Sequence, residues 1–139
     1  MIRPMSLDEA RALLGECRIG RLGCVSDDWP YVVPVSYIID GDNIYIHSLP
    51  GRKTRAMREN ERVCLQADDI KDEFDWRSAI AFGRYEEVTE TGERDWAMRR
   101  LLSRFPHLTP VESVPVHDGQ SSVVVFRIRI DGISGVREK

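Results

Sequence analysis

The sequence has no excess of basic residues and no long apolar run. Its 20 Lys and Arg residues are outnumbered by 23 Asp and Glu residues, which gives a formal net charge of −3. Nucleic-acid-binding domains usually carry a basic excess, so nucleic-acid binding is not expected. No apolar stretch approaches the roughly 20 residues that a membrane-spanning helix needs, so no membrane contact is expected. The segment after Met1 also lacks the apolar core of a signal peptide, which predicts a cytoplasmic protein.

Cysteines are few, and the common catalytic motifs are missing. Cys17, Cys24 and Cys64 have no C-x-x-C spacing, which argues against a disulfide framework and against a zinc site. His107 and His117 lie in a proline-rich stretch without metal-ligand spacing and are interpreted as surface residues. Gly-rich dinucleotide fingerprints, Walker loops and nucleophile elbows do not occur. The sequence therefore predicts one globular domain, residues 1–139, with a single hydrophobic core and no metal site.

The hydrophobic pattern predicts mostly strands. Strands are expected near residues 19–25, 31–39, 44–46, 63–67, 78–87 and 122–131, with turns at 26–30, 40–42 and 68–69. A capping box at Ser6 and Glu9 predicts a helix that closes at Gly15. Further helices are expected after Gly51 and from Thr91 to Pro106, followed by a loop over 106–120. Six strands with short helices predict a mainly β fold, an antiparallel barrel or sandwich.

Two of the predicted strands have irregular features. Pro34 interrupts the strand at 31–39, which indicates an edge or a bulge where backbone groups are free to bond a ligand. Ala79, Ala81 and Gly83 keep one side of the strand at 78–87 small. That pattern favours the close approach of a neighbouring sheet, a second subunit or a flat ligand.

The most informative stretch begins at Pro50-Gly51, where a strand pattern changes to a helical one. The first turn of that helix offers unpaired N–H groups and the positive end of the helix dipole. Arg52 and Lys53 add two cations at the same end, which is locally unfavourable unless an anion lies across them. Phosphate is the usual anion at such a place, although a solvated basic helix start explains the charges about as well.

Four other side chains have weaker functional patterns. His47 ends the strand just before this helix, where it either bonds a ligand or ties the strand end to the loop. The Ser36 hydroxyl serves a ligand or bonds to backbone. Trp29 and Trp76 flank strands and are interpreted as core or interface aromatics.

The order of these segments resembles the pyridoxamine 5'-phosphate oxidase-like split-barrel flavoproteins. The matching segments are residues 31–37, 44–48 and 51–53, and the segments 62–65 and 76–84 extend the match to the branch that contains nitroimidazole-resistance proteins. The resemblance covers roughly residues 7–105. It implies a six-stranded antiparallel split β-barrel with short helices, and a homodimer that holds FMN at the subunit interface.

The resemblance also implies which residues would contact FMN. The isoalloxazine edge would meet the main chain of one strand, here Val32, Val33, Pro34, Val35 and Ser36. The phosphate would meet Arg52 and Lys53. Ile46 and His47 would line the flavin, with His47 as the catalytic candidate near the reacting face, and Ser78 would supply a polar contact.

The expected activity is flavin-dependent oxidation or reduction of a small substrate, with nitroaromatics as one candidate class. True pyridoxamine phosphate oxidases carry a basic and aromatic C-terminal tail that residues 135–138 do not match, so vitamin B6 oxidation is not expected. Two alternatives stay open: a non-enzymatic flavin or haem carrier or sensor, and a cofactor-free interaction domain. In the expected flavoenzyme, the flavin would supply the redox chemistry and the protein would position it.

Overall fold

The computed structural model describes residues 1–106 and 123–139. Its elements are β1 (Ile2–Pro4), α1 (Leu7–Glu16), β2 (Ile19–Ser26), β3 (Trp29–Ser36), β4 (Ile38–Asp40), β5 (Asn43–Ser48), α2 (Arg52–Glu59), β6 (Arg62–Asp72), β7 (Asp75–Glu87), α3 (Thr91–Arg104) and β8 (Val124–Glu138). The loop expected over 106–120, with His107 and His117, lies outside the described residues apart from Pro106. No helix within those residues is long and apolar enough to cross a membrane.

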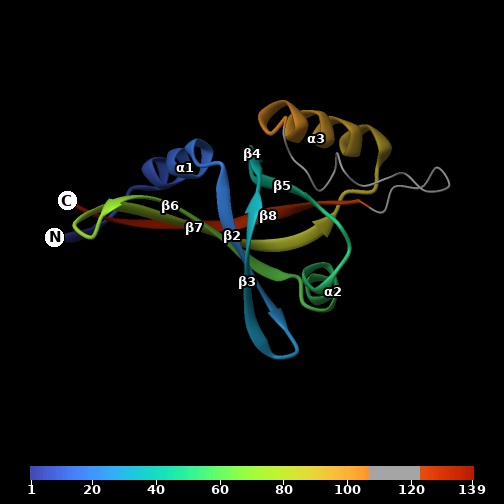
Figure 1. The fold of residues 1–139 in the computed structure, drawn as a ribbon, viewed down its shortest axis with the longest axis horizontal. Helices are drawn as coiled ribbons and strands as arrows, with labels where there is room; N and C mark the ends of the chain where they lie inside the picture. Colours follow the sequence, from blue (N-terminus) through green and yellow to red (C-terminus); the bar gives the residue numbers. More distant parts are fainter. Residues whose placement is uncertain (107–122) are drawn as a thin grey trace.

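The described strands form one antiparallel sheet. Its order is β3-β2-β6-β7-β8-β5-β4, with β1 paired to β8. The strands at the two ends of this order, β3 and β4, are separated in the chain only by Tyr37 (Figure 1). This arrangement confirms the expected mainly β, split-barrel fold. The expected number of strands was wrong, because the described part of the chain forms eight rather than six.

The break at Tyr37 corrects the expectation of one strand over 31–39. The Tyr37 side chain is fully buried, and its hydroxyl donates a hydrogen bond to the Leu14 carbonyl at the end of α1. Arg104 of α3 donates to the neighbouring carbonyls of Gly15 and Cys17, at 3.0 and 2.9 Å. Two side chains from elsewhere in the fold thus satisfy the carbonyls that a helix end leaves unpaired.

The strand register separates the two faces of the sheet. Leu22, Leu65 and Ala81 are directly opposite one another on β2, β6 and β7, and all three are fully buried in the main core. Ala79 shares that face, and at Gly83 a Cβ atom would come within 2.2 Å of the Arg129 carbonyl oxygen. The small residues of β7 therefore allow close packing within the protomer. Of the three partners that the sequence pattern allowed, the structure shows the neighbouring parts of the same sheet and core.

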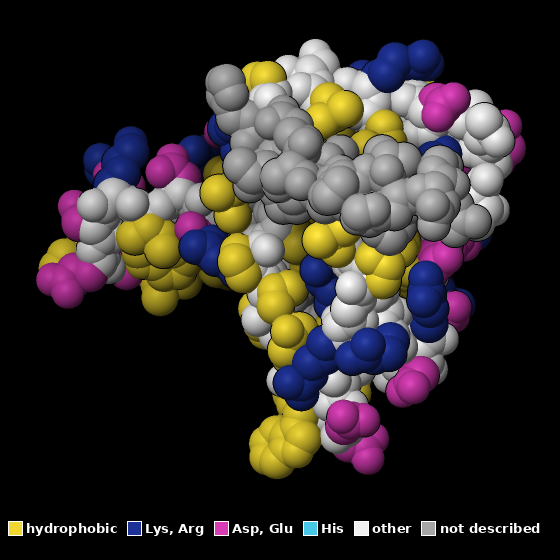
Figure 2. All heavy atoms as spheres, turned by 45° about the vertical axis from the view of Figure 1, so that its right-hand side comes forward, with side chains coloured by type: hydrophobic (Ala, Val, Ile, Leu, Met, Phe, Trp, Pro, Cys, Tyr) yellow, Lys and Arg dark blue, Asp and Glu magenta, His cyan; other side chains and the backbone are white. Residues whose placement is uncertain are grey.

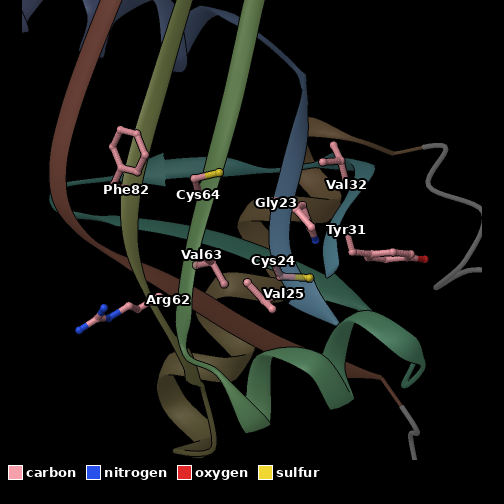
Figure 3. A pocket seen from close by; sticks show the side chains of 10 residues that line it. Gly23, Cys24, Val25, Tyr31, Val32, Arg62, Val63, Cys64 and Phe82 are labelled. Atoms are coloured by element: carbon pink, nitrogen blue, oxygen red, sulfur yellow. The ribbon is translucent and has the colours of Figure 1, made fainter. Parts of the chain in front are cut away.

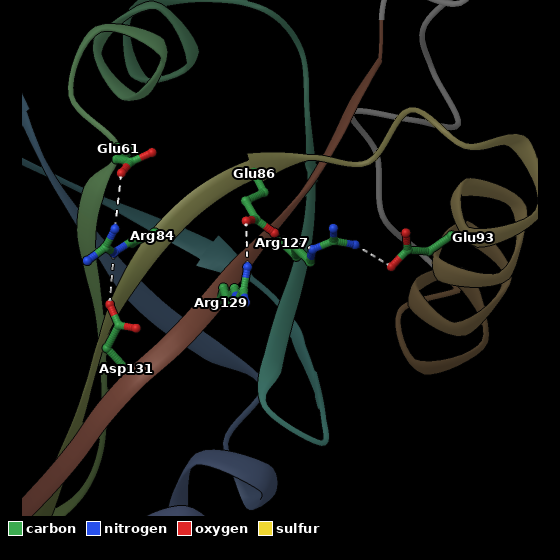
Figure 4. Close-up of polar contacts among 7 residues, drawn as sticks. All are labelled: Glu61, Arg84, Glu86, Glu93, Arg127, Arg129 and Asp131. Carbon is green, nitrogen blue, oxygen red and sulfur yellow. Dashed lines mark hydrogen bonds and ion pairs between the residues drawn. The ribbon is translucent and has the colours of Figure 1, made fainter.

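Helix α3 covers a second apolar cluster outside the barrel. Tyr45, Val125 and Leu101 belong to this cluster. Arg127 fastens the helix to the sheet, because its guanidinium bonds Glu86 of β7 at 2.8 Å and Glu93 of α3 (Figure 4). The Tyr45 hydroxyl donates to the same Glu93 carboxylate at 2.9 Å.

Several element boundaries differ from the expected ones. The capping box at Ser6 and Glu9 is present, but α1 continues through Gly15 to Glu16. The turn expected at 26–30 is confined to Asp27 and Asp28, whose φ angles of 51° and 64° suit a two-residue hairpin. Strand β6 runs through the expected turn at 68–69, and β8 continues to Glu138 instead of ending at 131.

Candidate functional site

The N-terminal turn of α2 carries two positive charges that form no ion pair in the part of the chain that the structure describes. It contains Arg52 and Lys53 and no acidic residue. The Thr54 hydroxyl accepts from the Gly51 N–H at 2.9 Å and donates to the Gly51 carbonyl at 3.0 Å, which fixes the chain entering the helix. The helix dipole and the two side chains thus place positive potential at one spot, the arrangement that anions bind.

Neutral groups hold Arg52 in place. Its Nε donates to the Ser26 hydroxyl at 3.0 Å, and its guanidinium carbon lies 4.6 Å from the centre of the Tyr31 ring. Both partners come from the β2–β3 hairpin, and neither carries a negative charge. The guanidinium is therefore oriented by its neighbours while its charge is left for an incoming group.

Lys53 lies deeper than Arg52 and is half-buried. Burial lowers the pKa of its ammonium group, and the nearby Cys24 thiol acts in the opposite direction. Lys53 forms no ion pair within residues 1–106 and 123–139, and a partly desolvated ammonium of this kind gains more from an anion than a fully solvated one would.

Strand β3 offers backbone groups along one open edge. Among the described strands it pairs with β2 alone. Pro30 and Pro34 are four residues apart, so both ring nitrogens point to the same side. Proline cannot donate to a ladder, so that side is the free edge. Val32 and Ser36 share this direction and present their N–H and carbonyl groups there. The interruption expected at Pro34 is confirmed as an edge position.

The side chains of β3 divide between the two faces of the sheet. Val33 and Val35 point to the barrel interior, where Val35 is buried in the main core. Val32 points outward and lies in one row with Gly23, Cys64 and Phe82 on three neighbouring strands. These residues line an apolar groove of about 320 Å³ on the outer face (Figure 3).

The structure places the other expected site residues further away. The side chain of Ile46 is fully buried in the main core, so only its backbone is left for any other contact. His47 lies on the opposite side of β5, the side that carries Tyr45 and faces the cluster under α3. Ser78 accepts a hydrogen bond from Gln66 at 2.9 Å, on the outer face of β7. None of these three side chains is brought together with Arg52 and Lys53.

His47 is polar, partly buried and incompletely bonded. Its Nδ1 is buried and has no hydrogen-bond partner among the described residues. Burial lowers the pKa of its imidazole below the ordinary value of 6.5. Less imidazolium is therefore present at neutral pH than in an exposed histidine, and the proton-donor role of His47 stays a prediction.

Ser26 and Tyr31 contact Arg52, and Cys24 lies near Lys53; together we call these five residues the cationic site. The three hairpin residues are not evident in the sequence as site residues. Each comes from the β2–β3 hairpin, which packs against α2 although 26 residues separate Ser26 from Arg52 in the chain. Only the hairpin register could have placed them beside the helix.

No group of three or more possible metal ligands occurs in the described ranges.

Comparison with known proteins identifies the family. The model of the pyridoxamine 5'-phosphate oxidase family matches residues 6–137. An uncharacterized protein of Rhizobium meliloti is 32% identical, over 96% of this chain and 93% of its own length.

Solved structures show the same fold. An FAD-binding protein from Mesorhizobium loti has a TM-score of 0.84 and 32% identity, covering 100% of this chain and 99% of that one. A Bacteroides thetaiotaomicron protein assigned provisionally to 5-nitroimidazole antibiotic resistance has a TM-score of 0.76 at 18% identity, over 99% and 87% of the two chains. The chain described above therefore belongs to the pyridoxamine 5'-phosphate oxidase family.

Proposed function

We propose that this protein binds a flavin through its FMN unit, at the free edge of β3 and the first turn of α2. The observation that carries the proposal is the pair Arg52 and Lys53, which has no ion-pair partner among the described residues and lies beside a strand edge with open N–H and carbonyl groups. The pair suits a phosphate, and the edge groups of Val32 and Ser36 suit the polar edge of a flavin ring. The Mesorhizobium loti relative, described as FAD-binding, supports a flavin as the ligand.

The activity we propose is oxidation or reduction of a small substrate, with nitroaromatics as the first class to test. A bound flavin supplies hydride and single-electron chemistry, while the protein supplies binding and orientation. In this chain Arg52 and Lys53 anchor the phosphate and the β3 edge orients the ring. The apolar side chains around Val32 limit the access of water to that edge.

We further propose that the protein is a homodimer in which the outer face of the sheet meets a second copy. Apart from Trp29, the exposed large apolar residues of the described strands lie on this face: Ile2, Ile19, Val25, Val32, Ile70, Phe82 and Val136. Phe82 is 50% exposed and Val32 is 63% exposed, beside the groove described above. Exposed apolar side chains that gather on one face often mark an interface with another protein. A second copy on this face would also enclose the ring beside β3.

Flavin titration of the purified protein tests the proposed site. Wild-type protein should bind FMN more tightly than riboflavin, which lacks the phosphate. Lys53→Ala should weaken FMN by about 1.5–3 kcal/mol, roughly tenfold to hundredfold, because a charge-assisted contact is lost, and should leave riboflavin unchanged. Lys71→Ala, at an exposed lysine in the last part of β6, is the matched control and should change neither affinity.

Two outcomes would contradict the proposal. If neither flavin binds, the site is not a flavin site. If Lys53→Ala weakens FMN and riboflavin equally, the pair does not contact the phosphate.

Two further measurements distinguish the alternatives. The absorbance spectrum of the protein as purified distinguishes bound flavin from bound haem, which has a Soret band. Reoxidation of the reduced protein by a nitroaromatic distinguishes an enzyme from a carrier.

A further inference from the structure

The apolar groove on the outer face lies beyond the last pair between two strands of the barrel. Strands β2 and β6 pair over residues 21–23 and 64–66, and the last pair joins Gly23 to Cys64. Cys24 and Val63, one residue further along each strand, also line the groove. Its volume of about 320 Å³ falls within the range of complete small-molecule sites, about 300–1,000 Å³. The groove is therefore large enough to hold a ligand of its own.

The floor and walls of the groove suit a flat ring. Gly23 has no side chain on the floor, and the Cys64 sulfur lies close to it, because a Cβ atom on Gly23 would come within 2.8 Å of that Sγ atom. Tyr31 and Phe82 line the groove from β3 and β7 (Figure 3). Aromatic rings and sulfur both make favourable contacts with an aromatic ring. These contacts favour an aromatic ligand over an aliphatic one.

Arg62 places a positive charge at one end of the groove. Its side chain is exposed and, in the part of the chain that the structure describes, forms no ion pair or hydrogen bond. Arg84, directly opposite on β7, is paired with Glu61 at 3.5 Å and with Asp131 at 3.3 Å (Figure 4). Those two carboxylates are engaged by Arg84, so Arg62 is left to bind an acidic group that a ligand brings.

The groove extends from the proposed flavin site to Arg62. Val32 lines it at the β3 edge, and Arg62 lies two strands away on β6. Neighbouring strands are about 4.8 Å apart, so the two residues are separated by roughly 10 Å, which one aromatic ring with a substituent at each end can span. In Figure 3 the Arg62 guanidinium lies on the side away from Val32. A ligand would thus place one end beside the flavin ring and the other at the mouth of the groove.

We propose that the groove binds a small aromatic acid, with its ring over Gly23 and Cys64 and its acidic group at Arg62. The inference rests on the proposed flavin function and adds the class of substrate. Figure 2 shows hydrophobic and basic side chains gathered together over the β2–β3 hairpin and α2, a combination that suits an apolar ligand with negative charge. A second copy on the outer face would cover the groove and enclose the ring.

Calorimetric titration of the full-length protein, with and without FMN, tests the inference. The probes are 4-nitrobenzoate and 4-nitrobenzamide, which have similar shapes and differ in charge. Wild-type protein should bind the benzoate at least about tenfold more tightly, because it gains a charge-assisted contact. Arg62→Gln should remove this preference and leave the benzamide within about twofold. Arg99→Gln, at an exposed arginine of α3, is the matched control and should change neither affinity.

A second pair of variants tests where the ring lies. Gly23→Ala adds a methyl group to the floor, so it should weaken both probes by about tenfold. Adding Cys64→Ala removes the sulfur that this methyl group meets and should restore both affinities to within about threefold of wild type. Unchanged affinities in Gly23→Ala would show that the ring does not lie in the groove.

The outcomes separate this inference from the proposal on which it rests. Equal affinities for the two probes in wild-type protein, or a preference that survives Arg62→Gln, would overturn the aromatic acid while FMN binding stands. If both probes bind as expected to protein that takes up no FMN, the groove is a binding site and the flavin proposal is wrong. If Arg62→Gln lowers the mass measured by light scattering, the arginine pairs with the second copy, and the inference is overturned.

Discussion

At the residue scale, the buried imidazole of His47 links stability to pH. Because burial lowers its pKa in the folded protein, the unfolded chain binds more protons just below pH 6.5. The free energy of unfolding should therefore fall as the pH drops below about 6.5. Above that pH, His47 should cause no change in stability. The limit for one group is about 1.4 kcal/mol for each pH unit, and a half-buried histidine should give a fraction of this.

Urea unfolding of wild-type protein and His47→Asn between about pH 7.5 and pH 5.5 measures the effect. The difference in unfolding free energy between the two proteins should shift in favour of the variant as the pH falls, because asparagine does not titrate in this range. Parallel pH profiles would mean that His47 titrates alike in the folded and unfolded states.

The cationic site also shows how far single residues can be interpreted from sequence. Arg52 and Lys53 follow a strand and open a helix, and that local order is sufficient to predict an anion site. Ser26 and Tyr31 carry no such local pattern, because they meet Arg52 only after the β2–β3 hairpin packs against α2. Trp29 was expected to be a core or an interface aromatic; its side chain is 73% exposed, which excludes the core and keeps the interface as a prediction.

At the scale of elements, Arg127 should determine how firmly α3 is held. Its side chain is 26% exposed and bonds carboxylates on both β7 and α3. Arg127→Gln should lower the free energy of unfolding by about 1–2 kcal/mol and speed amide exchange in α3, because Tyr45 is then the one side-chain partner that Glu93 keeps among the described residues. Hydrogen exchange and urea unfolding measure the two effects.

Arg129 supplies the matched control two residues further along β8. It bonds the same Glu86 carboxylate at 3.2 Å, but its side chain is 66% exposed and does not contact α3 through any ion pair in the described residues. Arg129→Gln should change stability by less than about 0.5 kcal/mol and leave exchange in α3 unaltered. Equal effects of the two variants would show that α3 is held by its apolar face alone.

Element types were more predictable than element ends. The period-two pattern and the capping box depend on neighbouring residues and were interpreted correctly. Asp68 and Asp69 were expected to form a turn, but Arg21 and Arg77 bond their carboxylates at 2.8 Å each and allow both to remain in β6. Likewise β8 continues past Asp131 because the register shifts opposite Phe82 and Gly83, and β7 then pairs with the remainder.

At the scale of the whole molecule, the outer face of the sheet should control assembly. Phe82→Asp places a charge beside the apolar groove and should convert the proposed dimer into monomers. Leu7→Asp on α1 is the control, because this residue is 61% exposed but lies on a helix packed against the other face of β7 and β8. Light scattering across a concentration series measures the mass of each protein. A wild-type monomer, or a Phe82→Asp dimer, would contradict the assignment of this face.

The prolines of β3 have a consequence for misassembly. An unpaired strand edge normally invites strand addition by another chain and, through it, aggregation. Pro30 and Pro34 remove two of the donors that an added strand would need, while Val32 and Ser36 keep theirs. The interrupted row can still bond a small planar molecule, which needs only one or two groups, but it cannot sustain a continuous ladder. The edge is thus open to a ligand and closed to fibril growth.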